Sequence, residues 1–190
     1  MTDTGSDQSE RVRLAKRLPR DGVGAEVGVW AGDHADLLWK TTRPYAMYLV
    51  DPYQRNSDLT NRSATVDTTQ EEIDYVYARL CVKHLHRPGV VVLRAESLRG
   101  ARMLTACGVS LDWAYIDARH DSESVSEDLR AWYPLVKPGG VLAGHDYQAL
   151  DVRLAVREFA RLHRLDVSVE TGGRGSYWVQ RNAEPSQATV

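Results

Sequence analysis

The sequence has few cysteines, no secretory signal and no long apolar run, and each shortage narrows the class of protein. No apolar stretch approaches the roughly 18 residues that a membrane-spanning helix needs, so we expect no membrane span and no membrane partner. The polar, acidic start MTDTGSDQSE lacks the basic and apolar segments of a secretory signal. We therefore expect a cytoplasmic protein in which both cysteines, Cys81 and Cys107, are reduced.

An excess of positive charge is also missing. The net charge is −2, and no stripe of basic residues interleaved with aromatic residues occurs, so nucleic acid is not an expected partner. Only four of the 24 basic residues are lysines, an arginine bias that is typical of a GC-rich genome rather than of a site. The length of 190 residues, with 43% hydrophobic and 26% charged residues, is typical of one soluble domain.

Short apolar runs alternate with helical patterns along most of the chain. Residues 1–9 have few apolar side chains and are predicted to be a disordered tail, followed by a single domain at 10–181 and a loose tail at 182–190. A short helix is expected from Glu10 to Leu18. Five buried strands are predicted at residues 25–29, 48–50, 90–93, 112–116 and 141–144.

Amphipathic segments lie between these strands. The clearest runs from Thr69 to His86 and begins with a capping box of Thr69 and Glu72. Strands that alternate with helices predict an α/β fold with a parallel sheet covered on both faces. Two more strands are predicted at 166–170 and 176–180; the TGGRG turn between them indicates a hairpin, so one edge strand should be antiparallel.

Ligands of an open parallel sheet bind at the carboxyl ends of its strands, and the first of these ends is rich in glycine. Gly28 and Gly32 allow a ligand to approach the backbone closely, and Asp51 at the end of the second strand can accept hydrogen bonds from both ribose hydroxyls of a nucleoside. The alternative is that these residues only form tight turns. Because the G-x-G-x-x-G spacing is missing, an NAD(P)-dependent oxidoreductase is disfavoured.

This pattern resembles the class I S-adenosylmethionine (SAM)-dependent methyltransferases, whose first motif is acidic-x-Gly-x-x-x-Gly. Glu26, Gly28, Gly32 and Asp51 match the family position by position. The resemblance implies a Rossmann-like, doubly wound, seven-stranded sheet in the order 3-2-1-4-5-7-6 with strand 7 antiparallel. It also implies that SAM is the cofactor and that the loop after strand three, with Ala95, Glu96 and Ser97, lies beside its adenine. Trp30, inside the glycine turn, either covers the cofactor or packs in the core.

The segment from Leu111 to Tyr147 resembles the short bacterial sugar O-methyltransferases of the macrocin type and the catechol-type enzymes that bind a divalent cation. That resemblance assigns a cation, Mg2+ or Mn2+, to Asp117, His145 and Asp146, with Asp117 also beside the cofactor. The alternative is that His145 stands beside a Mg2+ held by Asp117, Asp146 and water. A cation lowers the pKa of an acceptor hydroxyl and orients it. His120 or His145 is expected to be the general base. The alternatives are an exposed cap for His120 and carboxylates that orient substrate without metal.

The acceptor is expected to be a small molecule or an oligosaccharide. The polar segment from Pro52 to Thr68 is either a lid or a surface loop, and Tyr53, Arg55 and Tyr147 are the candidate substrate-binding residues. The resemblance implies a sugar or glycoside hydroxyl, and the arginine bias suggests an actinobacterial polysaccharide or natural product. A phenolic acceptor is the alternative, and a non-catalytic binding module is the alternative of another class. The acceptor pocket is expected to be either open or completed by the second subunit of a homodimer.

Overall fold

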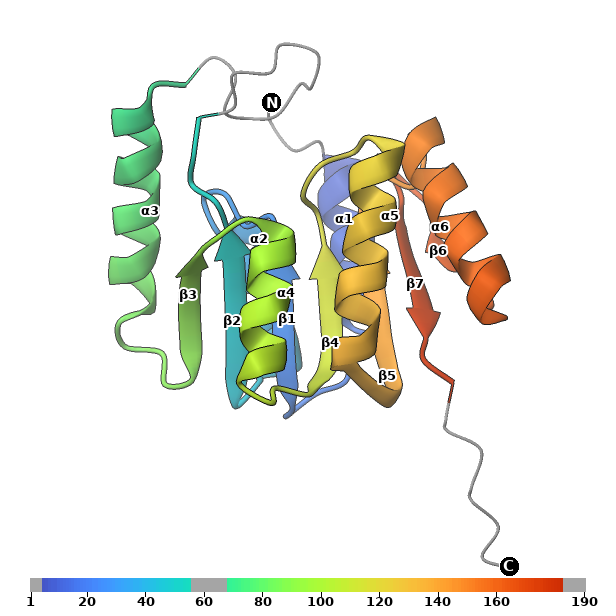
Figure 1. Cartoon of the computed structure of the whole chain (residues 1–190). Coiled ribbons are helices and arrows are strands. Elements are labelled where there is room, and N and C mark those ends of the chain that lie inside the picture. Colours follow the sequence, from blue (N-terminus) through green and yellow to red (C-terminus); the bar gives the residue numbers. More distant parts are fainter. Residues whose placement is uncertain (1–4, 56–67, 183–190) are drawn as a thin grey trace, which may run out of the picture.

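The structure, a computed structural model, describes residues 5–55 and 68–182, with only the backbone described for residues 5–7. Its centre is one seven-stranded sheet with the strand order β3-β2-β1-β4-β5-β7-β6 (Figure 1). The strands are β1 (Val23–Val27), β2 (Ala46–Asp51), β3 (Val90–Arg94), β4 (Leu111–Ile116), β5 (Val136–Gly144), β6 (Ser168–Glu170) and β7 (Ser176–Gln180).

The sheet has the predicted topology. Strands β1 to β5 pair in parallel, whereas β7 is antiparallel to both β5 and β6. The chain first builds outward from β1 to β3 and then returns to add β4 on the other side of β1. This reversal places the carboxyl ends of β1 and β4 side by side, and a crevice at such a switch point is where open α/β sheets bind ligands.

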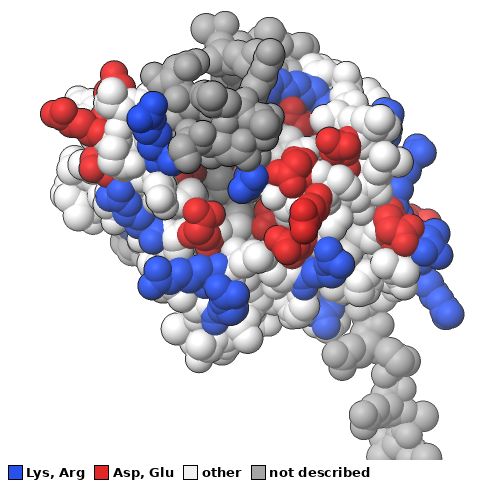
Figure 2. All heavy atoms as spheres, turned by 45° about the horizontal axis from the view of Figure 1, so that its top comes forward, with Lys and Arg blue, Asp and Glu red and all other residues white. Residues whose placement is uncertain are grey.

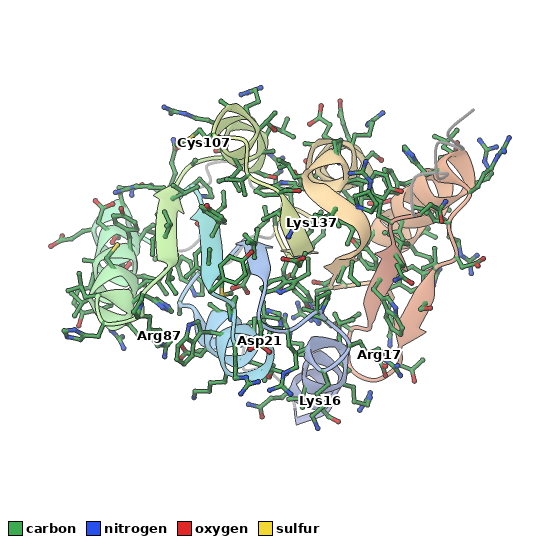
Figure 3. The ribbon with its side chains drawn as sticks, turned by 90° about the horizontal axis from the view of Figure 1, so that it is seen from below. Lys16, Arg17, Asp21, Arg87, Cys107 and Lys137 are labelled. Atoms are coloured by element: carbon green, nitrogen blue, oxygen red, sulfur yellow. The ribbon has the colours of Figure 1, made fainter. Side chains whose placement is uncertain are left out.

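Helices cover both faces of the sheet, as its buried strands require. Seen from below, α1 and α2 lie on one side of the sheet and α4, α5 and α6 on the other (Figure 3). The sheet thereby divides the apolar core into two clusters, one containing Leu14, Leu38 and Ile73 and the other Leu104, Leu129 and Phe159. The helices are α1 (Gly5–Ala15), α2 (Asp33–Thr42), α3 (Gln70–His84), α4 (Ser97–Ala106), α5 (Ser122–Trp132) and α6 (Leu150–His163), with a 3-10 turn, η1 (Tyr133–Leu135).

Two elements begin earlier than predicted. The first helix starts at Gly5 rather than Glu10, so residues 5–9, predicted to be disordered, lie in α1. Strand β5 starts at Val136 rather than at residue 141. A register irregularity between Leu111 and Trp113 lets the strand include the glycine pair at 139–140. The capping box of Thr69 and Glu72 at the start of α3 is present as predicted.

No helix in the described part of the chain is long and apolar enough to cross a membrane. The segment at 52–68, predicted to be a lid or a surface loop, is described only at its ends, and residues 56–67 lie outside the described residues.

Candidate active site

The turn after β1 is held tightly against the end of β4. Gly28 adopts a φ of +88°, and a Cβ added there would lie 2.0 Å from the carbonyl oxygen of Asp117. The backbone N–H of Asp117 in turn donates to the carbonyl of Val27 at 2.7 Å. Only glycine combines this left-handed φ with so close an approach of two backbones, so the predicted motif has a steric basis.

Asp51 organises this turn. Its Oδ2 accepts hydrogen bonds from the backbone N–H groups of Val29 and Trp30, both at 2.9 Å, and its Oδ1 accepts one from Tyr53 at 2.8 Å. Burial raises the pKa of Asp51, although these three N–H groups oppose the shift. Because each carboxylate oxygen has two lone pairs, Oδ2 is saturated and Oδ1 can accept one more bond. We therefore expect Asp51 to accept from one ribose hydroxyl, where the sequence suggested two.

Glu26 is paired with His34 on α2. Oε1 of Glu26 lies 2.9 Å from Nδ1 of His34, and the His34 ring packs against Tyr115 in a tilted arrangement with centroids 4.3 Å apart. Glu26 is buried, and burial together with the charge of Asp117 raises the pKa of its carboxyl well above the usual value. Among the described residues, Oε2 of Glu26 has no hydrogen-bond partner.

The loop after β3 brings Ala95, Glu96 and Ser97 to the same edge of the sheet. The backbone N–H of Ala95 donates to the carbonyl of Asp51 at 3.0 Å, which ties this loop to the end of β2. The Ser97 hydroxyl donates to the buried carboxylate of Asp128 on α5 and accepts from Nε1 of Trp132 at 2.9 Å. The sequence did not single out Asp128, which fixes Ser97 at the start of α4.

Asp128 should make the stability of the fold depend on pH. Burial raises the pKa of Asp128 to about 6, whereas an unfolded aspartate titrates at about 3.9. The folded state therefore binds more protons, and the stability that the protonated acid contributes is lost as pH rises through about 6. We expect Asp128→Asn, which keeps the acceptor for Ser97, to gain up to about 3 kcal/mol over the native protein above pH of about 7, and little at pH of about 4. Thermal unfolding of both proteins across this range measures the gain, and a difference independent of pH would contradict the assignment.

The two carboxylates predicted at the ends of β4 and β5, Asp117 and Asp146, both lie close to the ring of His120. Nε2 of His120 lies 3.1 Å from Oδ2 of Asp146 and 3.6 Å from Oδ1 of Asp117. One ligand atom from each of these three side chains falls within 4.8 Å of the others, a spacing that suits a metal ion. Asp146 has a φ of +58°, and its backbone carbonyl accepts from the N–H of Ala149 at 2.9 Å, so the loop that presents it is tightly turned.

The electrostatics of this cluster favour charged side chains. Contacts with Asp117 and Asp146 raise the pKa of His120 to about 10, despite its partial burial. Asp121, the next residue along the chain, caps α5 by accepting from the N–H of Ser124. Burial opposes ionisation of Asp117 and Asp146, yet their histidine neighbours outweigh it and hold the pKa of each carboxyl well below its usual value. Both carboxylates are therefore ionised near neutral pH.

His145, predicted as a cation ligand or base, lies behind this cluster. Its side chain is 1% exposed, with Nε2 at 2.8 Å from Oε1 of Glu10 and Nδ1 at 3.0 Å from Oδ2 of Asp146. Burial lowers the pKa of His145, but the contacts with Asp146 and Glu10 outweigh it and raise the pKa to about 9. Both ring nitrogens thus face carboxylates, and Nδ1 also lies 3.0 Å from a guanidinium nitrogen of Arg11. The three side chains spaced for a metal ion are Asp117, Asp146 and His120, whereas the sequence predicted His145 as the third.

Helix α1 supplies two site residues that the sequence did not predict. Besides Glu10, which is fully buried, Arg11 places a guanidinium nitrogen 2.9 Å from Oδ2 of Asp117. A groove of about 610 Å³ runs between α1 and α2, and Arg11 and His34 line it. The groove therefore borders the side chains that contact Asp117 and Glu26.

The three predicted substrate residues are differently placed. Tyr53 is buried, and its hydroxyl donates to the carbonyl of Trp30 at 3.1 Å, so it braces the glycine turn instead of facing an acceptor. Tyr147 turns its hydroxyl toward Arg157 on α6 at 3.3 Å. Arg55 is exposed, and its backbone N–H donates to the side-chain oxygen of Gln70.

Comparison with known proteins agrees with this geometry. The family described as the methyltransferase domain matches residues 25–147, which include the glycine turn, Asp51, Asp117 and Asp146. No curated protein is similar enough in sequence to count as a match.

Solved structures share the fold at low sequence identity. The O-methyltransferase NovP is 19% identical over 91% of this chain and 80% of its own, with a TM-score of 0.63. The calicheamicin methyltransferase CalS11 is 18% identical over 90% of this chain and 76% of its own, with a TM-score of 0.60. The N-methyltransferase NodS from Bradyrhizobium japonicum WM9, solved with S-adenosylhomocysteine (SAH), is 14% identical over 96% of this chain and 90% of its own, also at 0.63. Because O- and N-methyltransferases fit equally well, the likeness shows the fold and leaves the acceptor atom open.

The family match, the strand order and the motif at the end of β1 together show that this chain belongs to the class I SAM-dependent methyltransferases.

Proposed function

We propose that the protein is an O-methyltransferase acting on a hydroxyl of a sugar or glycoside. The observation that carries this proposal is the position of His120 Nε2 within 3.6 Å of both Asp117 and Asp146, at the edge of the sheet that also holds the glycine turn. A hydroxyl, unlike an amine, must lose its proton to become a good nucleophile, and a histidine held between carboxylates is suited to receive that proton.

The residues around the glycine turn fit SAM. Oε2 of Glu26 is a buried acceptor without a partner among the described residues, which suits the amino group of the methionyl part. Oδ1 of Asp51 has one lone pair left for a ribose hydroxyl, and the loop at Ala95 is hydrogen-bonded to Asp51, which suits the adjoining base. SAM supplies a methyl group on a positively charged sulfur, so the task of the chain is to orient and deprotonate the acceptor.

The cluster at β4 and β5 also fits a divalent cation. Two carboxylates and one imidazole form a donor set that Mn2+ accepts, and the two carboxylates alone suit Mg2+ with water. We propose that Asp117 and Asp146 hold this ion, which would lower the pKa of the acceptor hydroxyl and fix its oxygen.

His120 is the proposed base, and its partners determine when it can act. While both carboxylates are available to it, contacts with them keep the pKa of His120 near 10, so Nε2 carries a proton at neutral pH. With a divalent cation held by Asp117 and Asp146, these carboxylates would stabilise the protonated ring less, and Nε2 of His120 would be able to take the acceptor proton. The proposal thus links the cation to the base in one cluster.

The acceptor is proposed to carry no negative charge. Acidic side chains gather on the face that includes this edge of the sheet (Figure 2). Exposed Glu96 stands before α4, and exposed Glu123 and Glu127 lie on α5. A negative rim repels phosphorylated acceptors and tolerates neutral sugars. The names of NovP, an O-methyltransferase, and CalS11, a calicheamicin methyltransferase, support hydroxyl acceptors, and a phenol remains the second candidate.

The test is methyl transfer from labelled SAM to panels of neutral sugars, glycosides, phenols and amines, each with EDTA, Mg2+ or Mn2+. We expect transfer to a sugar hydroxyl that EDTA abolishes and added metal restores. Transfer only to amines would refute the proposal, full activity in EDTA would refute the cation, and no transfer to any acceptor despite SAH binding would favour a binding module.

Replacing the proposed base should separate catalysis from binding. We expect His120→Ala to lower kcat about 100-fold, which is typical of losing a general base, while SAH affinity measured by calorimetry stays unchanged. His86→Ala is the matched control, because His86 is exposed and lies beyond the end of α3. Equal rates for the two variants would show that His120 is only a surface residue.

A further inference from the structure

Helix α1 presents two opposite charges to the catalytic cluster and is held in place by different residues. Glu10, adjacent to Arg11 in the chain, contacts His145, whereas Arg11 contacts both Asp117 and Nδ1 of His145. Farther along, Arg13 and Arg17 pair with the two carboxylate oxygens of Glu170 on β6, at 3.0 Å and 2.6 Å. The anchoring pairs do not include any residue of the cluster, so anchoring and contact with the site can be separated by substitution.

Arg11 satisfies the outer oxygen of Asp117. Its guanidinium lies 2.9 Å from Oδ2, while Oδ1 faces His120 at 3.6 Å and His145 at 3.7 Å. The side chains of Arg11 and Asp117 are only 15% and 16% exposed, so water screens this pair weakly. A positive charge at this position stabilises ionised Asp117 and at the same time repels any second cation that approaches the carboxylate.

Glu10 acts on the second carboxylate, Asp146, through the ring of His145. Its Oε1 contacts Nε2 of His145 at 2.8 Å, and Nδ1 of the same ring contacts Oδ2 of Asp146 at 3.0 Å. Nδ1 also lies 3.0 Å from a guanidinium nitrogen of Arg11, so the His145 ring connects both residues of α1 to Asp146, and Glu10 holds the ring at Nε2. Partners behind a ligand of this kind orient it and tune how strongly it binds a metal.

We propose that α1 sets the cation affinity of the Asp117 and Asp146 pair, with Arg11 as a built-in counter-cation that weakens binding and Glu10 as a positioning residue that strengthens it through His145. This inference rests on the proposed cation site. It predicts effects of opposite sign from two neighbouring residues, which a purely structural role of the helix would not produce.

The experiment is calorimetric titration of the full-length protein with MnCl2 at constant neutral pH. We expect Arg11→Met to bind Mn2+ about tenfold more tightly than the native protein, because a nearby positive charge is removed. We expect Glu10→Gln to bind it about tenfold more weakly, the lower end of the range for losing a partner behind a metal ligand. Circular dichroism and thermal unfolding check that each variant is folded.

Two charge-matched controls test whether the effect comes from the site. Arg17→Met removes a positive charge, as Arg11→Met does, and Glu170→Gln removes a negative charge, as Glu10→Gln does. Both controls change the ion pairs that anchor α1 to β6 and not the contacts with Asp117 or His145. We expect each control to keep Mn2+ affinity within about twofold of the native protein and to change only the unfolding temperature. The charge of Arg17 is exposed and screened, and the charge of Glu170 is already paired with Arg13 and Arg17.

The outcomes distinguish this inference from the proposed cation site. Opposite shifts for Arg11→Met and Glu10→Gln support both. If the native protein binds no Mn2+ but Arg11→Met does, Arg11 is the counter-cation inferred here and the native enzyme works without the ion. Shifts of the same sign, or shifts equalled by the controls, overturn the role of α1. Absence of binding in every variant overturns both ideas.

Discussion

Replacing Asp117 with asparagine is expected to lower kcat for methyl transfer about 100- to 1,000-fold, within the range for losing a group that serves acid–base or metal chemistry. The substitution keeps the size of the side chain but removes the charge that Arg11 and His120 contact at 2.9 Å and 3.6 Å. It also leaves intact the backbone bond from the Asp117 N–H to Val27, which positions β4 beside β1. We therefore expect SAH affinity to change little while turnover is nearly lost. Initial rates with labelled SAM and calorimetry with SAH measure the two quantities.

Asp121→Asn is the control for this experiment. Asp121 lies four residues farther along the same loop, and its Oδ1 accepts the N–H of Ser124 at the start of α5. Asparagine is an equally good cap, so this variant should keep both the fold and the rate. If Asp117→Asn retains a third or more of the native kcat, the cluster at β4 and β5 does not carry the chemistry.

The sequence predicted the sheet and its polar edge because these depend on local patterns. Buried strands appear as short apolar runs, and the TGGRG turn with its flanking strands indicated the antiparallel β7. Residues that directly follow such strands, including Asp51, Asp117 and Asp146, must meet at one edge of a parallel sheet. That rule placed Asp117 and Asp146 near each other without any knowledge of their contacts, and in the structure both lie within 3.6 Å of His120.

The contribution of α1 was missed because it depends on contacts across the whole chain. Glu10 and His145 are separated by 135 residues, and no local pattern reports such a pairing. The sequence placed Glu10 at the start of a short helix but gave no reason to bury its carboxylate, which is buried because a histidine compensates its charge. One signal was available: Glu10, Leu14 and Leu18 recur every four residues, the spacing of a buried helix face, and all three are buried.

Asp51 and Tyr53 also have a structural task that the sequence did not predict, for a related reason. Their positions after β2 suggested contacts with ligand, but the structure uses both to hold the glycine turn, through Oδ2 of Asp51 and the hydroxyl of Tyr53. A turn of backbone N–H groups at the end of β1 needs acceptors of its own. The spacing of motifs does not separate residues that bind a ligand from residues that shape the surface it binds.

The shape of that surface is tested most directly at Gly28. We expect Gly28→Ala to reduce SAH affinity about 100-fold, the order of cost for displacing a binding element by about 1 Å, and to destabilise the fold by about 3 kcal/mol. The added methyl group would lie 2.0 Å from the Asp117 carbonyl oxygen, a backbone atom, so β1 and β4 would have to separate at their carboxyl ends. Calorimetry with SAH and chemical denaturation measure the two losses.

Gly108→Ala is the control for Gly28→Ala. It measures the stability cost of a positive φ without a close contact between two backbones. Gly108 also has a positive φ, +66°, but a Cβ there would meet nothing within 4 Å among the described residues. It should therefore cost only about 1 kcal/mol of stability, the penalty of a left-handed alanine, and leave SAH affinity unchanged. Because the two variants share the conformational penalty, the difference between them measures the contact of the β1 turn with Asp117. If Gly28→Ala binds SAH as well as Gly108→Ala does, the cofactor does not lie on this turn, and the assignment of Glu26 and Asp51 to the cofactor site fails with it.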